Sequence, residues 1–211
     1  MILLVFKFFC FVQDKIYIIQ GILARRLNDG IHPKKTIINY GSWFLEKMPP
    51  NSLVVDIGCG DGELVQLFLD HGHEAVGIEI DRRNVKESLY ARGLIRVCDA
   101  MDINFDDFGD YSVVTMSNSL EHFRDRSQLL TNMKKILQKK DGVLLVRVPA
   151  LERDWLTVFK CRLGISFFLD STHFVEYSIS ELEKELECAG FNMIIDKVAF
   201  GEIYAICNIK R

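Results

Sequence analysis

The sequence has no excess of positive charge, few prolines and no paired cysteine motif. Its 211 residues carry 26 lysines and arginines against 29 aspartates and glutamates, and this net charge of −3 does not favour binding to nucleic acids or anionic membranes. The six cysteines form no C-x-x-C pair, which excludes a zinc ribbon and a thioredoxin-like motif. Their apolar neighbours indicate buried free thiols in a reducing cytoplasm.

A long uninterrupted apolar run is also lacking. The chain begins with MILLVFKFFCFVQ, but Lys7 and then Asp14 and Lys15 interrupt this segment, whereas a membrane span needs about 20 apolar residues. A basic start and a small-residue cleavage site, which are typical of signal peptides, are missing. We therefore expect residues 1–32 to form an extra strand or helix packed on the core or on a partner, and membrane contact is not expected.

From residue 33 onward, short apolar strands alternate with helical patterns, without repeats or linkers. The expected helices are 33–48, 63–71, 84–92, a helix around 129–137, and one that begins at a capping box of Ser180 and Glu183 and ends at Gly190. The expected strands are 53–57, 75–80, 94–98, 111–116, 143–148, 192–200 and 202–209, the last two as an antiparallel hairpin. This alternation predicts an α/β fold with a mostly parallel, doubly wound sheet and helices on both faces.

A glycine-rich stretch, VVDIGCGDGEL, links the first of these strands to a helix. Glycines at this position let a ligand approach the backbone closely. The dinucleotide fingerprint is G-x-G-x-x-G, but here Gly58, Gly60 and Gly62 alternate, so the third glycine comes one residue early. The pattern alone is therefore a weak indication of the ligand.

Acidic residues gather around the same edge of the predicted sheet. They are Asp56, Asp61, Glu63, Glu79, Asp81, Asp99 and Asp102. Seven acids would repel a diphosphate and suit a ligand with a sulfonium, an ammonium and a ribose diol. Acids at a helix N-terminus also favour the helix dipole, which would explain Asp61 and Glu63 without any ligand.

Taken together, these motifs resemble those of the class I S-adenosylmethionine-dependent methyltransferases, over roughly residues 33–209. The resemblance implies a Rossmann-like sheet of seven strands with the last one antiparallel. It implies that Asp56 faces the cofactor's ammonium, Glu79 in VGIEID holds the ribose, Asp99 in RVCDAMD holds the adenine, and Ser117 meets the methionine end. The implied cofactor-binding residues are Asp56, Gly58, Cys59, Gly60, Gly62, Glu79, Ile80, Asp99, Ala100, Met101, Ser117 and Asn118.

Within that class, the segments LEHF and DSTHFVEYS resemble the small-molecule branch, which includes ubiquinone-type O-methyltransferases. The proline pair of DNA amino-methyltransferases and the Pro-Cys of cytosine-C5 enzymes are missing, so a nucleic-acid acceptor is not expected. The insertion 149–177 should cover the acceptor. Its Arg153, Lys160 and Arg162 indicate an anionic acceptor, or alternatively a solvated basic face or a dimer surface.

Two histidines are the candidate catalytic residues. His122 follows the fourth strand, although it could simply bond the backbone at a helix start, and His173 lies in the insertion, where it is favoured as base or acceptor ligand. Some ubiquinone-type enzymes hold a divalent metal here, and Glu121 and His122 match part of that pattern. Because Asn118 replaces an expected acid and adjacent residues chelate poorly, no metal is expected.

Two other functions remain open at this point. Glu79 would also suit a nicotinamide-dependent oxidoreductase, but Glu63 and the acidic surroundings oppose that assignment. A protein that binds the cofactor without catalysis is a third hypothesis. The favoured interpretation is a cytoplasmic methyltransferase acting on a small molecule, with homodimer formation left open.

Overall fold

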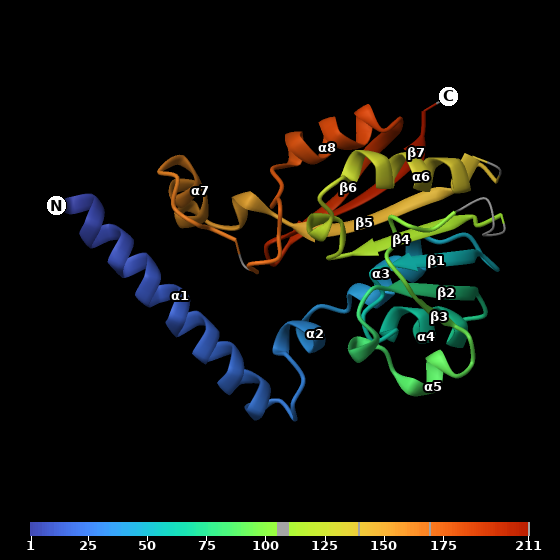
Figure 1. Ribbon diagram of the computed structural model, residues 1–211, viewed down its shortest axis with the longest axis horizontal. Helices are drawn as coiled ribbons and strands as arrows, with labels where there is room; N and C mark the ends of the chain where they lie inside the picture. The colour runs from blue at the N-terminus through green and yellow to red at the C-terminus, as the bar shows by residue number, and fades with distance from the viewer. Residues whose placement is uncertain (105–109, 139, 169, 211) are drawn as a thin grey trace. The chain divides into compact units, whose positions relative to one another are not determined.

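The computed structural model describes residues 1–104, 110–138, 140–168 and 170–210, which form two compact units, Met1–Trp43 and Phe44–Arg211. The second unit contains a seven-stranded sheet in the order β3-β2-β1-β4-β5-β7-β6 (Figure 1). Its strands are β1 Leu53–Ile57, β2 Glu74–Glu79, β3 Ile95–Val97, β4 Val113–Ser117, β5 Val143–Pro149, β6 Phe191–Ala199 and β7 Glu202–Ile209. The helices are α3 Tyr40–Lys47, α4 Glu63–Asp70, α5 Glu87–Tyr90, α6 Arg126–Gln138, α7 Trp155–Arg162 and α8 Ile179–Cys188.

The first five strands pair in parallel, and β7 pairs antiparallel with both β5 and β6. The predicted seven-stranded α/β sheet with an antiparallel last strand is therefore confirmed. The order reverses at β1, where β2 and β4 pair on either side, and ligands of such sheets bind beside this point at the carboxyl ends of the strands.

Successive side chains of a strand point to opposite faces, and each face carries helices. On one face, Val55 and Ile57 of β1 join a buried cluster with Leu130 of α6 and Leu182 of α8. On the other face, α4 packs on β1 and β2. These two helical layers cover both faces of the sheet, and the loops at the strand ends follow from this packed core.

The predicted helix 33–48 is wrong, because the chain forms two helices, α2 Pro33–Ile37 and α3. Ile38 between them adopts an extended conformation with φ −108° and ψ 105°. The Asn39 side chain then accepts a hydrogen bond from the Ser42 amide at 3.1 Å, which starts α3. The helical spacing of apolar residues continues across the break between α2 and α3, so the sequence pattern does not reveal it.

Two further boundaries differ from the prediction. The capping box of α8 is formed by Ser178 and Glu181, since the chain stays extended until Ser178, whose φ is −73° and ψ 158°. The expected helix 84–92 shortens to α5 because Asp81 caps a separate 3-10 helix at Arg82–Asn84. The remaining ends either agree with the prediction, as in β1 and β7, or differ from it by one to three residues.

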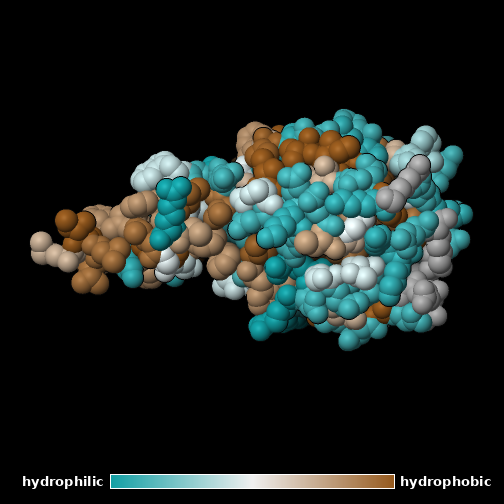
Figure 2. All heavy atoms as spheres, turned by 90° about the horizontal axis from the view of Figure 1, so that it is seen from above, coloured by the Kyte–Doolittle hydropathy of each residue, from teal (hydrophilic) through white to brown (hydrophobic). Residues whose placement is uncertain are grey.

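The first unit contains α1, a helix over Ile2–Leu27, so the helical alternative for the N-terminal segment is correct. Arg25 and Arg26 occupy its last turn, where basic side chains favour the helix dipole. Figure 2 shows hydrophobic residues along α1 and mainly hydrophilic residues over the visible face of the second unit. Within the described ranges, no helix is both long enough and apolar enough to cross a bilayer. Packing of α1 on the core or on a partner stays a prediction.

The insertion 149–177 leaves the sheet at the end of β5 and includes the 3-10 helix Leu151–Arg153 and α7, while position 169 lies outside the described residues. Its two ends lie side by side. The Leu151 amide donates to the Tyr177 carbonyl at 2.7 Å, and the Tyr177 amide donates to the Pro149 carbonyl at 3.1 Å.

The six cysteines are free, as expected from their apolar neighbours. Their burial is not uniform, however, because Cys207 is buried whereas Cys188 at the end of α8 is exposed. The exposed position follows from the last turn of α8, which presents Glu187 and Cys188 to solvent.

Candidate functional site

A cavity of about 700 Å³ lies at the carboxyl ends of the strands beside β1. This volume suits a cofactor together with a small acceptor. Eight of the predicted site residues line it: Gly58, Glu79, Ile80, Asp99, Ala100, Met101, Asn118 and His122. The other six predicted residues, Asp56, Cys59, Gly60, Gly62, Ser117 and His173, are not among the residues that line it.

Glu79 ends β2 and is 7% exposed. One carboxylate oxygen, Oε2, accepts from the Gly60 amide at 2.9 Å, and Oε1 accepts from the Asp81 amide at 2.9 Å and from Asn84 Nδ2 at 3.3 Å. The carboxylate thus ties the glycine loop to the end of β2. It is held in one orientation at the cavity, where it can accept further hydrogen bonds from hydroxyl groups.

The three glycines of the loop all have positive φ, but they serve different needs. A Cβ at Gly58 would lie 2.6 Å from Ser119 Cβ, and one at Gly62 would lie 2.5 Å from Leu89 Cδ1. At Gly60, whose φ is +55°, no heavy atom of the described chain would lie within 4 Å of a Cβ. At Gly58 and Gly62, the space that a Cβ would need is occupied by the protein's own side chains. The expectation that all three glycines make room for a ligand is therefore kept for Gly60 alone.

Asp56 in β1 and Cys59 within the glycine loop are both buried, and neither is among the residues that line the cavity. Asp56 is 2% exposed and accepts a hydrogen bond from the Thr115 hydroxyl at 2.6 Å. Burial raises the pKa of Asp56 to about 7, and burial likewise raises the pKa of the Cys59 thiol. Asp56 therefore links β1 to β4 two residues before the first glycine of the loop.

The turn after β3 forms another wall of the cavity. Asp99 Oδ1 accepts from the Met101 amide at 2.8 Å, which fixes the turn Asp99-Ala100-Met101. Cys98, Ala100 and Met101 add apolar surface beside the carboxylate. A flat ring with an amino group at its edge would fit such a wall.

Asn118, directly after β4, has a φ of +51°. Its Nδ2 donates to Glu202 Oε1 of β7 at 3.1 Å, while its Oδ1 is buried without a hydrogen-bond partner in the described structure. Ser119 lines the cavity and donates from Oγ to the Ile57 carbonyl at 2.7 Å, whereas Ser117 pairs with Arg147 in the sheet. The serine that lines the cavity is therefore Ser119, two residues after the predicted Ser117.

Asp81, one of the acids expected at this edge, also lines the cavity. Sequence reasoning missed several other lining residues: Ile78, Asn84, Cys98, Ser119, Phe123, Arg124, Asp125, Thr172 and Phe174. Those at 119–125 directly follow a predicted strand end, so their position alone could have indicated them. Thr172 and Phe174 come from the insertion, and no local pattern predicts that they return to this edge of the sheet.

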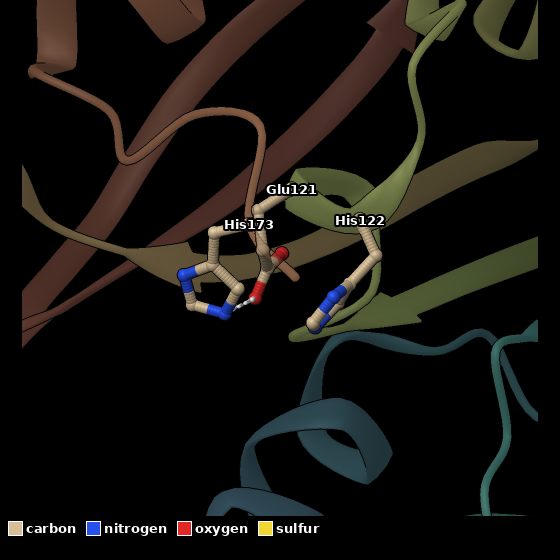
Figure 3. A group of neighbouring side chains, drawn as sticks. All are labelled: Glu121, His122 and His173. Atoms are coloured by element: carbon tan, nitrogen blue, oxygen red, sulfur yellow. Dashed lines mark ion pairs between the residues drawn. The ribbon is translucent and has the colours of Figure 1, made fainter. Parts of the chain in front are cut away.

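Glu121, His122 and His173 form a cluster beside the cavity (Figure 3). The first two lie on the 3-10 helix Leu120–His122, and His173 comes from the insertion. The two imidazole rings are 4.7 Å apart between centroids at 79°, and His173 Nε2 lies 3.9 Å from Glu121 Oε1. The backbone joins the two segments, because the Phe174 amide donates to the Glu121 carbonyl at 2.9 Å.

The three side chains differ in their protonation. Burial raises the pKa of Glu121 to about 7, and burial together with the neighbouring His173 lowers the pKa of His122. Burial alone would lower the pKa of His173, but the carboxylates of Glu176, Glu121 and Asp170 outweigh it and raise that pKa. One carboxylate and two imidazoles could hold a metal ion or exchange a proton with a bound molecule.

Two cations of the insertion that were expected to meet an anionic acceptor, Arg153 and Lys160, do not line the cavity. Arg153 is ion-paired with Glu176 and donates to the Phe167 carbonyl at 2.6 Å, and Lys160 is buried. The arginine that lines the cavity is Arg124, which lies over the Phe174 ring at 4.8 Å. An anionic group in the cavity would therefore meet Arg124.

Comparison with known proteins adds to this geometry. A family model described as a methyltransferase domain matches residues 33–195. The chain is 25% identical over 138 residues to the tRNA (carboxymethyluridine(34)-5-O)-methyltransferase of Arabidopsis thaliana, an overlap of 62% of this chain and 33% of that protein. It is 29% identical over 108 residues to the 2-methyl-6-phytyl-1,4-hydroquinone methyltransferase of Synechocystis sp., with 48% and 33% covered. The chain thus spans a third of the length of these two relatives.

Among solved structures, the fold is similar to that of the 1,6-didemethyltoxoflavin-N1-methyltransferase of Burkholderia thailandensis, with bound 1,6-didemethyltoxoflavin and S-adenosylhomocysteine. The TM-score is 0.63 at 14% identity, and the match covers 96% of this chain and 89% of that one. At this identity the similarity establishes the fold.

Proposed function

Because this chain belongs to the class I S-adenosylmethionine-dependent methyltransferases, we propose that it methylates a small-molecule acceptor held in the cavity beside β1. S-adenosylmethionine is the cofactor of this family, so the alternative of a nicotinamide-dependent oxidoreductase is set aside. The observation that carries the proposal is one cavity in which Glu79, Asp99 and His122 all take part.

The cofactor would lie along the strand ends. Glu79, whose carboxylate is already oriented by two backbone amides, would accept from the ribose hydroxyls. The turn at Asp99 and Met101 would hold the adenine, with the Asp99 carboxylate accepting from its amino group. Asn118 and Ser119, which line the cavity after β4, would meet the methionine end.

Methyl transfer is an in-line displacement. The bond between the methyl carbon and the sulfonium sulfur breaks, its electron pair stays on sulfur, and a new bond forms to the acceptor's nucleophilic atom. The protein contributes mainly alignment of the two reactants and exclusion of water. His122 lines the cavity and is placed to contact the acceptor, while His173 supports it from behind.

A small acceptor is favoured by the charges around the cavity. The described residues that line it include four acids and a single arginine, Arg124; the acids are Glu79, Asp81, Asp99 and Asp125. The chain as a whole carries a net charge of −3. A polyanionic acceptor such as tRNA, which the Arabidopsis relative's name specifies, would need a basic surface. An acceptor with a single anionic group would suit Arg124. We place the enzyme in the cytoplasm, in keeping with its free cysteines.

The test begins with calorimetric titration of S-adenosylhomocysteine into wild type and the Glu79→Ala variant. The variant should bind at least ~10-fold more weakly, about 1.4 kcal/mol, because it loses the carboxylate that faces the ribose. Glu87→Ala, at an exposed position in α5, serves as the control and should bind like wild type. Equal affinity of Glu79→Ala and wild type would refute the ribose assignment.

The acceptor class is tested with methyl-labelled S-adenosylmethionine and two pools, a small-metabolite extract and total tRNA. Label should enter the metabolite pool. Label in tRNA alone would refute the small-molecule proposal. Tight cofactor binding without transfer to either pool would favour the hypothesis of a non-catalytic module.

A further inference from the structure

The cluster of Glu121, His122 and His173 joins two segments that are far apart in the sequence. Figure 3 shows the three side chains directed toward one another, and their potential ligand atoms lie within 4.8 Å of one another. Ligand atoms at about 2.0–2.2 Å from a shared ion are at most ~4.4 Å apart. The ligand atoms are thus within ~0.4 Å of the separation that a shared ion allows, a difference that a small side-chain movement can close.

Glu121 is the first reason to expect an ion here. Its side chain is 1% exposed, and neither carboxylate oxygen has a hydrogen-bond partner among the described residues. His173 Nε2 lies 3.9 Å from Glu121 Oε1, which is beyond hydrogen-bond distance. A buried carboxylate without a partner is costly, and a bound cation would satisfy both oxygens.

The two imidazoles give the second reason. His122 Nδ1 lies 2.9 Å from the Thr172 hydroxyl, and His173 Nδ1 lies 3.2 Å from Glu176 Oε1. Glu176 is itself fixed by its ion pair with Arg153. Histidines that ligate metals are typically held in this way at one ring nitrogen, and the other nitrogen is left for the ion.

We propose that Glu121, His122 and His173 bind one divalent ion of the first transition series, such as zinc, iron, cobalt or manganese. Two imidazoles with one carboxylate suit these ions, whereas magnesium and calcium prefer oxygen ligands alone. The expectation of no metal considered Glu121 and His122, which are adjacent in the chain. The third ligand, His173, comes from the insertion, and sequence spacing did not reveal it.

The role of the ion rests on the proposed function, although its binding does not. His122 lines the cavity, so the ion would lie at the acceptor end, where His122 would act as a ligand instead of a base. A bound divalent ion supplies positive charge that stabilises a deprotonated oxygen. The acceptor class that follows is a molecule with a phenolic or carboxylate oxygen.

The test uses the full chain without a purification tag, freed of metal with a chelator and then dialysed. Cobalt(II) is added while its visible absorption is followed, and zinc binding is measured by calorimetry. Wild type should bind one cobalt ion per chain with the band intensity of a four- or five-coordinate site. Glu121→Gln and His173→Asn should each weaken binding at least ~10-fold. His71→Asn, which removes an exposed imidazole, is the matched control and should bind like wild type.

S-adenosylhomocysteine is titrated into each variant in parallel, and retained binding shows that the variant is folded. Loss of cobalt binding with retained cofactor binding in Glu121→Gln and His173→Asn supports the proposal. Equal cobalt affinity in wild type and both variants, or no stoichiometric binding by wild type, overturns it. If cobalt binds as expected but no acceptor is methylated, the ion site stands and the proposed function fails.

Discussion

Gly58 offers the sharpest test of how the glycine loop is built. Its φ is +72°, and a Cβ there would lie 2.6 Å from Ser119 Cβ, well inside the carbon–carbon contact distance of about 3.5–4.0 Å. In Gly58→Ala, the left-handed backbone costs roughly 1–2 kcal/mol and the overpacking another 1–3 kcal/mol. The free energy of unfolding should fall by about 2–5 kcal/mol.

Gly60→Ala is the matched control, because Gly60 shares a positive φ of +55° but has open space around its Cβ position. It should lose roughly 1–2 kcal/mol, from the backbone alone. Adding Ser119→Gly to Gly58→Ala removes the clash and should recover about 1–3 kcal/mol relative to additivity, whereas the same change beside Gly60→Ala should be additive.

Urea denaturation of the three single and two double variants measures these free energies, and titration with S-adenosylhomocysteine follows the effect on the cavity. The reasoning would be refuted if Gly58→Ala cost no more than Gly60→Ala, or if Ser119→Gly showed no coupling to Gly58→Ala. In either case Ser119 would not be what requires glycine at position 58.

Two other predictions concern stability. Since the folded-state pKa of Asp56 is raised from 3.8 to about 7, the folded state holds the proton more tightly than the unfolded chain, and stability should decline as pH rises from about 4 to 7 by up to about 4 kcal/mol. Asp56→Asn keeps an acceptor for Thr115 and should show a smaller decline than wild type in urea melts across that range, and the remaining decline comes from Glu121, whose pKa is also raised to about 7. A slope equal to that of wild type would count against the assignment to Asp56. Ser178→Ala should lower the free energy of unfolding by about 0.5–2 kcal/mol, because α8 loses its N-terminal cap. Ser180→Ala should lower it by less than about 0.5 kcal/mol, as measured by thermal or urea unfolding. The opposite order of the two effects would favour the capping box of Ser180 and Glu183 that the sequence predicts.

The sequence was most informative where structure is local. The strand Leu53–Ile57 was predicted to the residue, because a buried apolar run followed by alternating glycines has few other conformations. The carboxyl-end rule of parallel sheets predicts from the sequence that Glu79 and Asp99 lie at one edge of the sheet. Both residues do line the cavity at that edge.

The sequence was least informative where long-range contacts decide. Thr172 and Phe174 reach the cavity from an insertion about fifty residues after β4, and nothing in their local pattern predicts this. The start of α8 was misplaced because Ser180 and Glu183 fit the capping pattern as well as Ser178 and Glu181 do. Tertiary contacts of the preceding extended segment, including Tyr177 with Pro149, selected between them.

The paired ends of the insertion have a consequence for how the acceptor specificity of such an enzyme can change. Pro149 and Tyr177 are held together by backbone bonds, so the segment between them begins and ends at nearly the same point. Doubling the length of a closed loop costs only about 0.6 kcal/mol, and the sheet and α8 need not move to accommodate it. Evolution or an engineer could therefore exchange the residues from 152 to 176 as one cassette. Such an exchange would replace Thr172, His173 and Phe174 while leaving in place Glu79 and Asp99, the residues proposed to hold the cofactor.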